Sequence, residues 1–268
     1  MSTNADAAAT DLSGVRCVVT GATSGLGAAM ADALLYAGAT VALAARPGTH
    51  LDDAVATRSE RGDRVLAVPV DVRDAASVDA AATDAIARLG HVDLLVNNAG
   101  IGMRTVNPRF FDRPMAFWEV EPDRFTDVVA TNLTGYFLVA RAFAPHMVQR
   151  RSGRIVNVSI NHQTMGRRGF VPYGPSRAGS EALSNVMTED LRDHGVAVDV
   201  LLPGGATATG MIPDELPDEA RRRLLRPEIM GPPIVFLASA EAAGLTGTRI
   251  VATEFDAWLA NFRAGRGT

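Results

Sequence analysis

The stretch TGATSGLG, residues 20–27, decides the fold class. It follows the apolar run VRCVVT (15–20) and leads into GLGAAMADALLYAG, which has the composition of a helix. Gly21 permits a tight turn, and glycine at 25 and 27 lets the backbone approach a pyrophosphate. The helix that follows offers free N–H groups and the positive end of its dipole to phosphates. A glycine cluster between a strand and a helix therefore predicts a dinucleotide site.

Apolar runs and helical patterns alternate along the rest of the chain. The other runs expected as strands are TVALAA (40–45), RVLAVPV (64–70), HVDLLVNN (91–98), GRIVNVS (153–159), VAVDVLLP (196–203) and TRIVAT (248–253). Helices are expected over 51–61, 75–89, 123–150 and 172–195. Continuous apolar strands are typical of a parallel sheet that is covered on both faces. The pattern predicts a single-domain α/β fold, a Rossmann-type doubly wound parallel sheet with helices on both faces.

We expect one domain over residues 13–268, preceded by a flexible tail over residues 1–12. Two segments, 100–122 and 204–233, do not fit the alternation and are rich in Pro and Gly. Both follow predicted strands, and ligands bind at the carboxyl ends of the strands in such sheets. Long loops in compact domains are often functional, so we expect substrate loops here, with plain surface loops as the alternative.

The composition excludes several classes of protein. The formal net charge is -4, which gives no support for nucleic-acid binding. Cys17 is the single cysteine, so an internal disulfide is impossible; we expect it buried in a strand and the protein in a reducing compartment. The N-terminal residues show no basic region followed by an apolar core, so we expect no signal peptide, and no apolar stretch reaches membrane-spanning length. We therefore expect a cytoplasmic protein that binds no membrane, no nucleic acid and no metal.

Further motifs follow in a recognisable order. They are Asp71-Val72 at the close of the third strand, Asn97-Asn98-Ala99-Gly100 at the close of the fourth, Asn132 in TNLTG, Tyr173 in YGPSR, and Pro203-Gly204 at the close of the sixth strand. Together with the TGxxxGxG spacing, they make residues 12–250 resemble the short-chain dehydrogenase/reductase (SDR) family. The resemblance implies a nicotinamide dinucleotide cofactor. The residues that we expect at the cofactor are Gly21, Thr23, Ser24, Gly25, Leu26, Gly27, Arg46, Asp71, Val72, Asn98, Ala99, Gly100, Tyr173, Arg177, Pro203, Gly204, Thr207 and Thr209.

The end of the second strand bears on the choice of cofactor. It reads Ala44-Ala45-Arg46, without the acid that commonly bonds the ribose 2′-OH of NAD. Arg46 can instead pair with a 2′-phosphate. This favours NADP(H). NAD(H) stays possible, because Ser24 stands where many NADPH-using relatives in the family carry a second basic residue.

Tyr173 and Arg177 lie four residues apart, so they share a face if a helix begins at Tyr173. A fixed positive charge lowers the pKa of a nearby tyrosine, which is near 10 when unperturbed. The resemblance implies that Tyr173 is the acid/base and that its basic partner holds the nicotinamide ribose. The family has lysine where this chain has Arg177. The chain contains no lysine at all, so chain-wide usage already accounts for the arginine. Asn132 resembles the asparagine that kinks a helix in the family.

The residue that binds the substrate oxygen is open. The family's serine lies about thirteen residues before the tyrosine, and that register places Ile160 there. Ser159 is one residue earlier, and a one-residue shift along a strand reverses the side-chain direction unless a bulge restores it. Asn161 is the alternative candidate, and His162 is a further possible proton donor.

These features predict an NADP(H)-dependent oxidoreductase that interconverts a carbonyl and a secondary alcohol. The altered serine and lysine positions leave two alternatives: non-redox chemistry such as epimerisation or elimination, or a cofactor-binding protein with little catalysis. The family resemblance implies a homodimer or homotetramer, formed through the two long helices. An apolar or aromatic carbonyl substrate would suit the large side chains of the two loop segments, which are Phe110, Phe111, Met115, Phe117, Trp118, Met211 and Met230. The alternative is that these residues belong to the core or to an interface.

Overall fold

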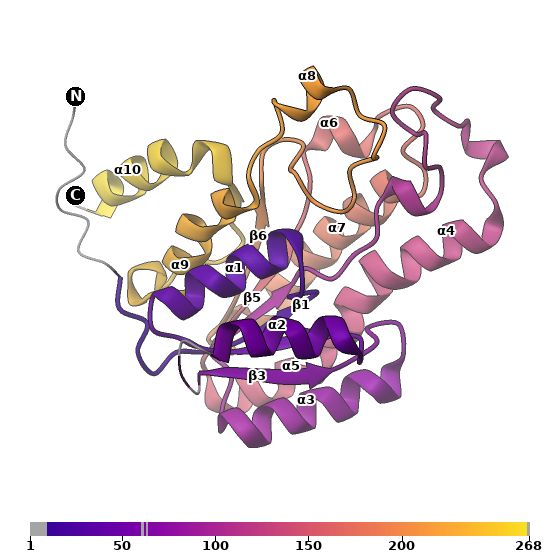
Figure 1. Cartoon of the computed structure of the whole chain (residues 1–268). Helices are drawn as coiled ribbons and strands as arrows, with labels where there is room; N and C mark the ends of the chain where they lie inside the picture. Colours follow the sequence, from indigo (N-terminus) through magenta and orange to yellow (C-terminus); the bar gives the residue numbers. More distant parts are fainter. Residues whose placement is uncertain (1–9, 60–61, 63, 267–268) are drawn as a thin grey trace.

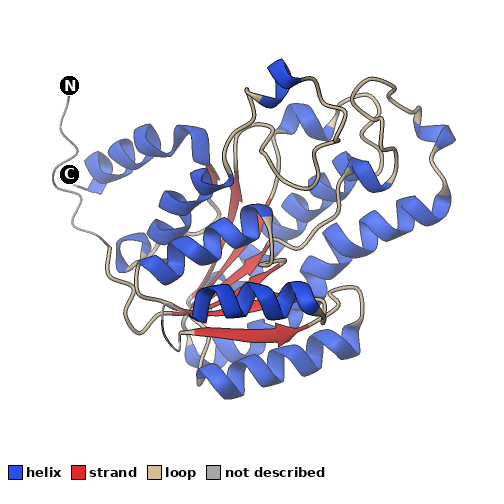
Figure 2. Cartoon of the chain, viewed as in Figure 1, coloured by secondary structure: helices blue, strands red, loops and turns tan. Residues whose placement is uncertain are grey.

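A seven-stranded sheet forms the centre of the protein in the computed structural model, which describes residues 10–59, 62 and 64–266 (Figure 1). The strands are β1 (Arg16–Thr20), β2 (Thr40–Ala45), β3 (Val65–Pro69), β4 (Leu94–Asn97), β5 (Gly153–Val158), β6 (Val196–Leu202) and β7 (Arg249–Val251). Neighbouring strands are all parallel, in the order β3-β2-β1-β4-β5-β6-β7. The chain winds outward in both directions from the β1–β4 pair, so the predicted doubly wound sheet is confirmed (Figure 2).

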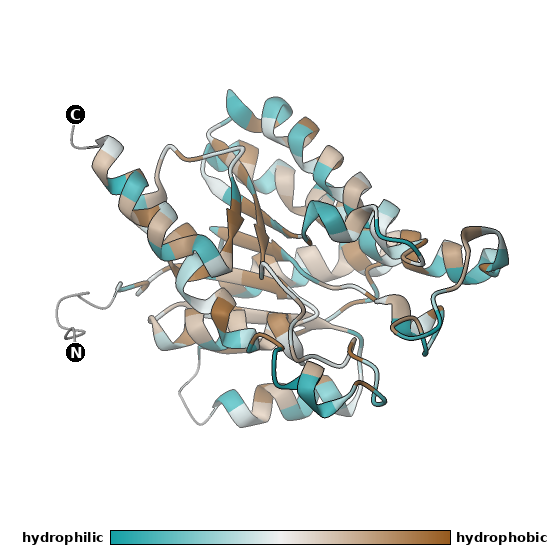
Figure 3. Ribbon diagram, turned by 90° about the horizontal axis from the view of Figure 1, so that it is seen from above, coloured by the Kyte–Doolittle hydropathy of each residue, from teal (hydrophilic) through white to brown (hydrophobic). Residues whose placement is uncertain are grey.

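Helices cover both faces of this sheet. One face carries α1 (Gly25–Tyr36), α2 (Thr49–Ser59), α9 (Gly231–Ala238) and α10 (Phe255–Arg266). The other face carries α3 (Ala75–Leu89), α5 (Gly135–Arg150) and α7 (Tyr173–Arg192). Seen from above, the apolar strands lie between these two layers of helices (Figure 3). The sheet is therefore buried on both sides, which explains why its strands are continuous apolar runs.

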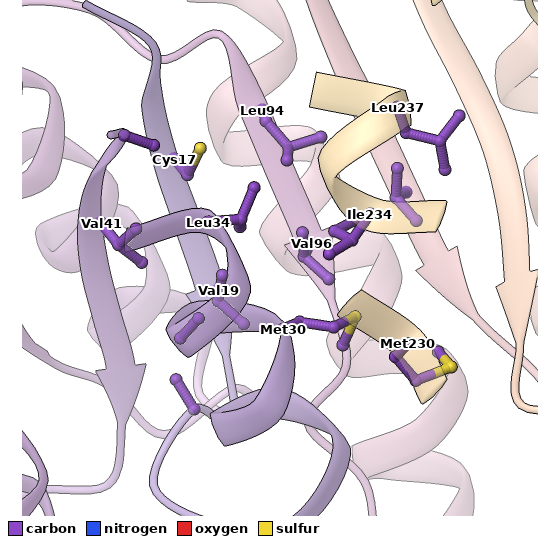
Figure 4. Packing of buried hydrophobic residues seen from close by; sticks show 14 of the residues in the cluster. Cys17, Val19, Met30, Leu34, Val41, Leu94, Val96, Met230, Ile234 and Leu237 are labelled. Atoms are coloured by element: carbon purple, nitrogen blue, oxygen red, sulfur yellow. The ribbon is translucent and has the colours of Figure 1, made fainter. Parts of the chain in front are cut away.

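Successive residues of a strand contribute to different cores. In β1, Cys17 and Val19 belong to the cluster under α1 and α9, whereas Val18 belongs to the cluster under α3 and α5. The first cluster includes Leu34 of α1 and Ile234 of α9, and Figure 4 shows Ile234 beside Val96 of β4. Cys17 is fully buried there, as the sequence predicted, and burial raises the pKa of its thiol. A thiol kept protonated in this way is inert.

The helix expected over 123–150 is interrupted. It consists of α4 (Pro122–Val129), a π-helical turn (Ala130–Thr134) and α5. A π-helical turn inserts one extra residue into the helix, which bends the axis and frees a backbone group. The interruption lies at Asn132, one of the residues that the sequence singled out. The other long helix, expected to end at Gly195, ends at Arg192 and continues as turns to Gly195.

Both ends of the chain differ from the expectation. Residues 1–9 of the expected tail lie outside the described residues, but Leu12 is buried and its amide donates to the carbonyl oxygen of Ala37 at 2.7 Å. The domain thus begins before residue 13. The C-terminal segment forms α10, which the sequence analysis did not predict. In α10, Trp258 stacks on Phe262 with ring centres 5.2 Å apart, and both pack against Phe236 of α9.

The two irregular segments lie at the same edge of the sheet. Segment 100–122 follows the carboxyl end of β4, and segment 204–233 follows that of β6. Arg104 of the first donates to the carbonyl oxygens of Gly210 and Ile212 in the second, at 3.3 and 3.4 Å, and pairs with Asp214. The second segment is more regular than expected, since it contains α8 (Asp218–Arg221) and the start of α9. Within the described part of the chain, no helix is long and apolar enough to cross a lipid bilayer.

Candidate functional site

A glycine-rich turn links β1 to α1. Gly21 and Gly25 have φ angles of +65° and +55°, in the left-handed region that glycine adopts without steric cost. A Cβ atom at Gly27 would collide with the carbonyl oxygen of Gly21 and lie 2.9 Å from its carbonyl carbon. The three positions therefore keep side chains away from the N-terminus of α1, where free N–H groups point outward.

The side chain of Asn98 braces this turn from the end of β4. Its Nδ2 atom donates to the carbonyl oxygens of Thr20 and Gly21, at 2.9 and 3.2 Å. The amides of Asn98 and Ala99 both donate to Oγ1 of Thr20, at 2.9 and 3.1 Å. These bonds tie the carboxyl ends of β1 and β4 together at the point where the strand order reverses.

The remaining residues of the turn differ in exposure. Ser24 is the exposed N-cap residue of α1, and its hydroxyl makes no capping bond. Leu26 packs against the core below the turn, and Thr23 is half-buried. The hydroxyl of Ser24 therefore does not cap α1 and lies beside the free N–H groups at the start of that helix.

Charged residues gather at the ends of β2 and β3. Arg46 is exposed after β2, and Asp71 follows β3 on the neighbouring strand. Arg73 donates to both carboxylate oxygens of Asp71, at 3.1 and 2.8 Å. The hydrogen bonds from Arg73 lower the pKa of Asp71, and Arg46 adds a weaker Coulombic contribution. Two guanidinium groups therefore act on one carboxylate at this edge.

Tyr173 and Arg177 share one face at the start of α7. The helix begins at Tyr173, and Cζ of Arg177 lies 5.5 Å from the centre of the tyrosine ring. The ring of Tyr173 also packs against a small cluster that contains Met103, Phe110 and Phe170. An acid/base candidate thus lies between a guanidinium and an apolar surface.

Arg177 is only 3% exposed, and its guanidinium is held tightly. Its Nη1 atom donates to the hydroxyl of Tyr136 at 2.6 Å and to the carbonyl oxygen of Val158 at 3.0 Å. Burial alone would lower the pKa of Arg177, but attraction from the phenol groups of Tyr136 and Tyr173 outweighs it and raises the pKa. The guanidinium therefore stays charged.

Asn132 lies in the π-helical turn and faces the end of β4. Its Oδ1 atom accepts from the amide of Ile101 at 2.9 Å. Its Nδ2 atom donates to the carbonyl oxygen of Ile101 at 2.9 Å and to Oγ of Ser176 at 3.2 Å. One turn later, Gly135 packs against Val72, where an added Cβ would lie 3.0 Å from Cγ2 of that valine. The turn thus joins segment 100–122 to α7 and to the end of β3.

The segment after β5 holds the candidates for the substrate oxygen. Ser159 is buried, and its hydroxyl has no hydrogen-bond partner among the described residues. The side chain of Ile160 has no polar atom and forms no hydrogen bond. Its backbone carbonyl oxygen accepts from Nη2 of Arg249 at 2.8 Å. Asn161 is half-buried and donates to the carbonyl oxygen of Gly204 at 2.8 Å. His162 is exposed, with Nε2 3.1 Å from a carboxylate oxygen of Glu181.

The segment after β6 closes over the glycine turn. Pro203 is buried, and Gly204 has a φ of +95°. Oγ1 of Thr207 is turned inward and donates to the carbonyl oxygen of Gly205 at 3.2 Å. Thr209 faces the glycine turn, since its Cγ2 lies 3.1 Å from the position of a Cβ on Gly25. Of the two threonines, only Thr209 is placed against the turn.

A large cleft in the described chain does not coincide with Tyr173. It has a volume of about 1350 Å³ and lies between α1, α9 and α10. It reaches the glycine turn at Gly25 and Thr209, but neither Tyr173 nor Arg177 lines it. The catalytic candidates are therefore enclosed by the two loop segments rather than by this cleft.

The apolar residues suggested for a substrate pocket separate into three groups. Phe110 is buried against Phe170 near Tyr173. Met230 is fully buried in the core under α1, which agrees with the alternative that some of these residues belong to the core. Phe117 and Trp118 are 68% and 75% exposed. Length and position along the chain do not reveal which side of a loop a residue faces.

Tyr136 was missed by the sequence analysis. Two signals were available: it follows Asn132 by one helical turn, and it is one of three tyrosines in the chain. Its contact with Arg177 depends on how α5 and α7 pack across the end of β5, which spacing within one helix cannot reveal.

A nicotinamide dinucleotide fits this arrangement. The bare turn at Gly21, Gly25 and Gly27 and the N-terminus of α1 suit a pyrophosphate. The buried Nε atom of Arg177 has no hydrogen-bond partner among the described residues, which suits a ligand at the other end of the site. Such a ligand would lie across the carboxyl ends of β1, β4 and β5, with Tyr173 beside its reactive part.

Comparison with known proteins agrees with this geometry. Residues 16–220 match the family model described as short chain dehydrogenase. The 3-oxoacyl-(acyl-carrier-protein) reductase FabG of Vibrio harveyi is 32% identical over 244 residues, covering 88% of this chain and 95% of that protein. The acetoacetyl-CoA reductase of Rhizobium meliloti (strain 1021) is 34% identical over 247 residues, with the same coverage of 88% and 95%.

A solved structure is similar along nearly the whole chain. The 3-ketoacyl-(acyl-carrier-protein) reductase from Brucella melitensis, complexed with NADH, superposes with a TM-score of 0.79. It is 29% identical, and the match covers 90% of this chain and 97% of that chain.

Replacing Gly27 tests the glycine turn. Gly27→Ala should weaken dinucleotide binding by about tenfold or more, because its Cβ displaces the carbonyl of Gly21 and the side chain of Asn98. The dissociation constant of NADPH, measured by fluorescence titration, checks this. Gly265→Ala is the matched control, since a Cβ there meets open space on α10. Equal affinities in both variants would contradict a phosphate site at this turn.

Proposed function

The chain belongs to the short-chain dehydrogenase family of nicotinamide-dependent oxidoreductases, and we propose that it is an NADP(H)-dependent enzyme that interconverts a carbonyl and a secondary alcohol. The observation that carries the proposal is the pair at the start of α7, where the charged guanidinium of Arg177 lies against the ring of Tyr173. When bound, the cofactor supplies or accepts the hydride. Tyr173 then gives a proton to the developing alkoxide oxygen.

Arg177 keeps a fixed positive charge beside Tyr173 throughout the reaction. A guanidinium does not release its proton at neutral pH, so Arg177 acts through its fixed position and charge and does not relay protons. The proton that leaves Tyr173 is therefore replaced from solvent. Asn132 keeps the loop after β4 and the first turn of α7 in register, through its bonds to Ile101 and Ser176.

The preference for NADP(H) rests on the charges at the ends of β2 and β3. Arg46 is exposed, has no hydrogen-bond or ion-pair partner among the described residues and has no acid beside it at the end of β2, so its guanidinium is available to a 2′-phosphate. The Brucella melitensis reductase was solved with NADH, which keeps NAD(H) as the competing choice.

An apolar carbonyl compound is the substrate class that suits the site best. Met103, Phe110 and Phe170 form the surface beside Tyr173 and would exclude water from the reacting carbonyl. The two curated relatives are named for 3-oxoacyl and acetoacetyl thioesters. We therefore include such β-keto thioesters among the candidate substrates, together with simple ketones and aldehydes.

A homodimer or homotetramer is part of the proposal. Phe125 of α4, Phe137 of α5 and Val186 of α7 are large apolar side chains that lie exposed on the long helices. Their burial in an interface through these helices would remove apolar area from water. The cytoplasmic location expected from the sequence stays a prediction.

A second candidate function follows from position 160. Ile160 offers no hydrogen-bonding side chain where the family carries serine, and this favours non-redox chemistry or cofactor binding alone. A hydrogen-bond donor at the substrate oxygen contributes strongly to the rate of hydride transfer, and isoleucine cannot supply one. Turnover of the cofactor separates the two functions directly.

Tyr173→Phe should reduce activity by about 10²- to 10⁴-fold, because it removes the proton donor. NADPH oxidation at 340 nm, with ketones, aldehydes and β-keto thioesters, measures this, and NADPH binding should be retained. A variant as active as the wild type would refute the role of Tyr173. A wild type that binds NADPH tightly but oxidises it with no substrate would favour the second candidate function.

Arg46→Ala should lower kcat/KM for NADPH by about 10- to 100-fold and leave that for NADH nearly unchanged. The reason is that a charge-assisted bond to a 2′-phosphate contributes about 1.5–3 kcal/mol. Arg124→Ala, an exposed arginine of α4, is the control. A wild type that prefers NADH would overturn the proposed cofactor.

Ser159→Ala and Asn161→Ala should separate the candidates for the substrate oxygen. The true partner should lose about 10²- to 10³-fold in kcat, and the other variant should lose little. Ser159→Ala should leave the melting temperature almost unchanged, because its hydroxyl has no partner to lose. Asn161→Ala breaks the bond to Gly204, so its kcat is compared at equal folded fraction. Full activity in both variants would exclude both residues.

A further inference from the structure

Arg177 differs from the other buried arginines of the described chain. Arg154 pairs with Asp199, and Arg58 pairs with Asp32. No carboxylate pairs with Arg177 in the part of the chain that the structure describes, although its side chain is almost completely buried. A buried charge without a counter-ion costs free energy, so something else must stabilise this guanidinium.

Tyr136 supplies most of that stabilisation. Its hydroxyl accepts from Nη1 of Arg177 at 2.6 Å, and its ring centre lies 5.3 Å from Cζ. The same hydroxyl donates to the carbonyl oxygen of Val158 at 3.1 Å, and that oxygen also accepts from Nη1 at 3.0 Å. The three groups close a ring of hydrogen bonds at the end of β5, one residue before Ser159.

Tyr136 acts here as a neutral phenol. Burial raises the pKa of Tyr136, against the opposing attraction of Arg177. The hydroxyl already donates its hydrogen bond to the carbonyl oxygen of Val158. It is therefore an acceptor for the guanidinium and not a counter-anion. A neutral partner fixes the position of the cation without cancelling its charge.

The rest of the guanidinium stays available for the site. Nη1 is used twice by Tyr136 and Val158, whereas Nε is buried without a partner. Nη2 lies against Gly100, where any Cβ would collide with it. Nη2 therefore faces the carboxyl end of β4, and the guanidinium carbon Cζ lies 5.5 Å from the ring centre of Tyr173.

We propose that Tyr136 is a positioning residue that, together with Arg177, forms one functional unit: Tyr136 anchors one nitrogen of the guanidinium so that the others face Tyr173 and the cofactor. This inference rests on the proposed function. The unit requires the planar fork of arginine. A lysine at 177 would present a single ammonium group and could not bridge Tyr136 and the site in the same way. The arginine is then more than a consequence of the chain's lysine-free composition.

Each tyrosine of the chain provides one arm of the test. Tyr136→Phe keeps the ring and removes the hydroxyl, and we expect kcat for NADPH-dependent reduction to fall about tenfold or more. The control is Tyr36→Phe, an 87% exposed residue of α1 whose loss should change nothing. Tyr173→Phe reports the proposed acid/base. Melting temperatures and active-site titration correct each kcat for the folded fraction, so a purely structural role would leave the corrected kcat unchanged and overturn the inference.

A double-mutant cycle tests whether the two residues act as a unit. Arg177→Lys should lose about tenfold in kcat, and the Tyr136→Phe/Arg177→Lys double variant should be no worse than the poorer single variant. Losses that multiply would overturn the unit. If the wild type turns over no substrate, the proposed carbonyl–alcohol function fails instead. The cycle is then read from the dissociation constants of NADPH, with the same two outcomes.

Chemical rescue gives a second reading that does not depend on the folding of Tyr136→Phe. In Arg177→Ala, added guanidinium should restore activity or NADPH affinity several-fold more than methylammonium at equal concentration. The reason is that the Tyr136 hydroxyl and the Val158 carbonyl are arranged for one planar nitrogen of a fork. Equal rescue by both cations, or rescue by neither, would overturn the proposed positioning role.

Discussion

All seven strands run in the same direction, and the site depends on this constraint. Parallel strands bring their carboxyl ends to one edge of the sheet, and the order reverses between β1 and β4. Segments that are far apart in the sequence therefore leave the sheet side by side. The glycine turn, the loop after β4, the loop after β5 and the loop after β6 become neighbours because each follows a strand of this sheet.

Asparagine side chains tie these neighbouring segments to one another. Asn98 joins the turn after β1 to the end of β4, Asn132 joins the loop after β4 to α7, and Asn161 joins the loop after β5 to the loop after β6. Each asparagine donates a side-chain hydrogen bond to a backbone carbonyl oxygen of the segment that it joins. A site held in this way is preorganised for a ligand, since little conformational entropy is left to lose on binding.

The guanidinium of Arg177 stands out against this background. Elsewhere in the described chain the buried arginines are neutralised by aspartates, which fixes the fold and leaves no charge for chemistry. At 177 the charge is held by aromatic rings, a hydroxyl and a carbonyl oxygen, none of which is negative. An unneutralised cation is one of the groups that stabilise developing negative charge in a site.

The sequence by itself determined the order of the elements, the parallel sheet and the family. These follow from local signals: apolar runs for strands, helical spacing for helices, and glycines at a turn that needs a positive φ. It also singled out Tyr173, Arg177 and Asn132 as candidate site residues, because the spacing and order of motifs can be read directly from the sequence.

Only the tertiary structure decided which side chains meet. It placed Tyr136 against Arg177, Thr209 rather than Thr207 against the glycine turn, and Met230 in the core. It formed α10 on the aromatic residues of α9, and it put the π-helical turn at Asn132. The physical reason is that these contacts join elements far apart in the chain, so they depend on how helices pack across the sheet and not on any local periodicity.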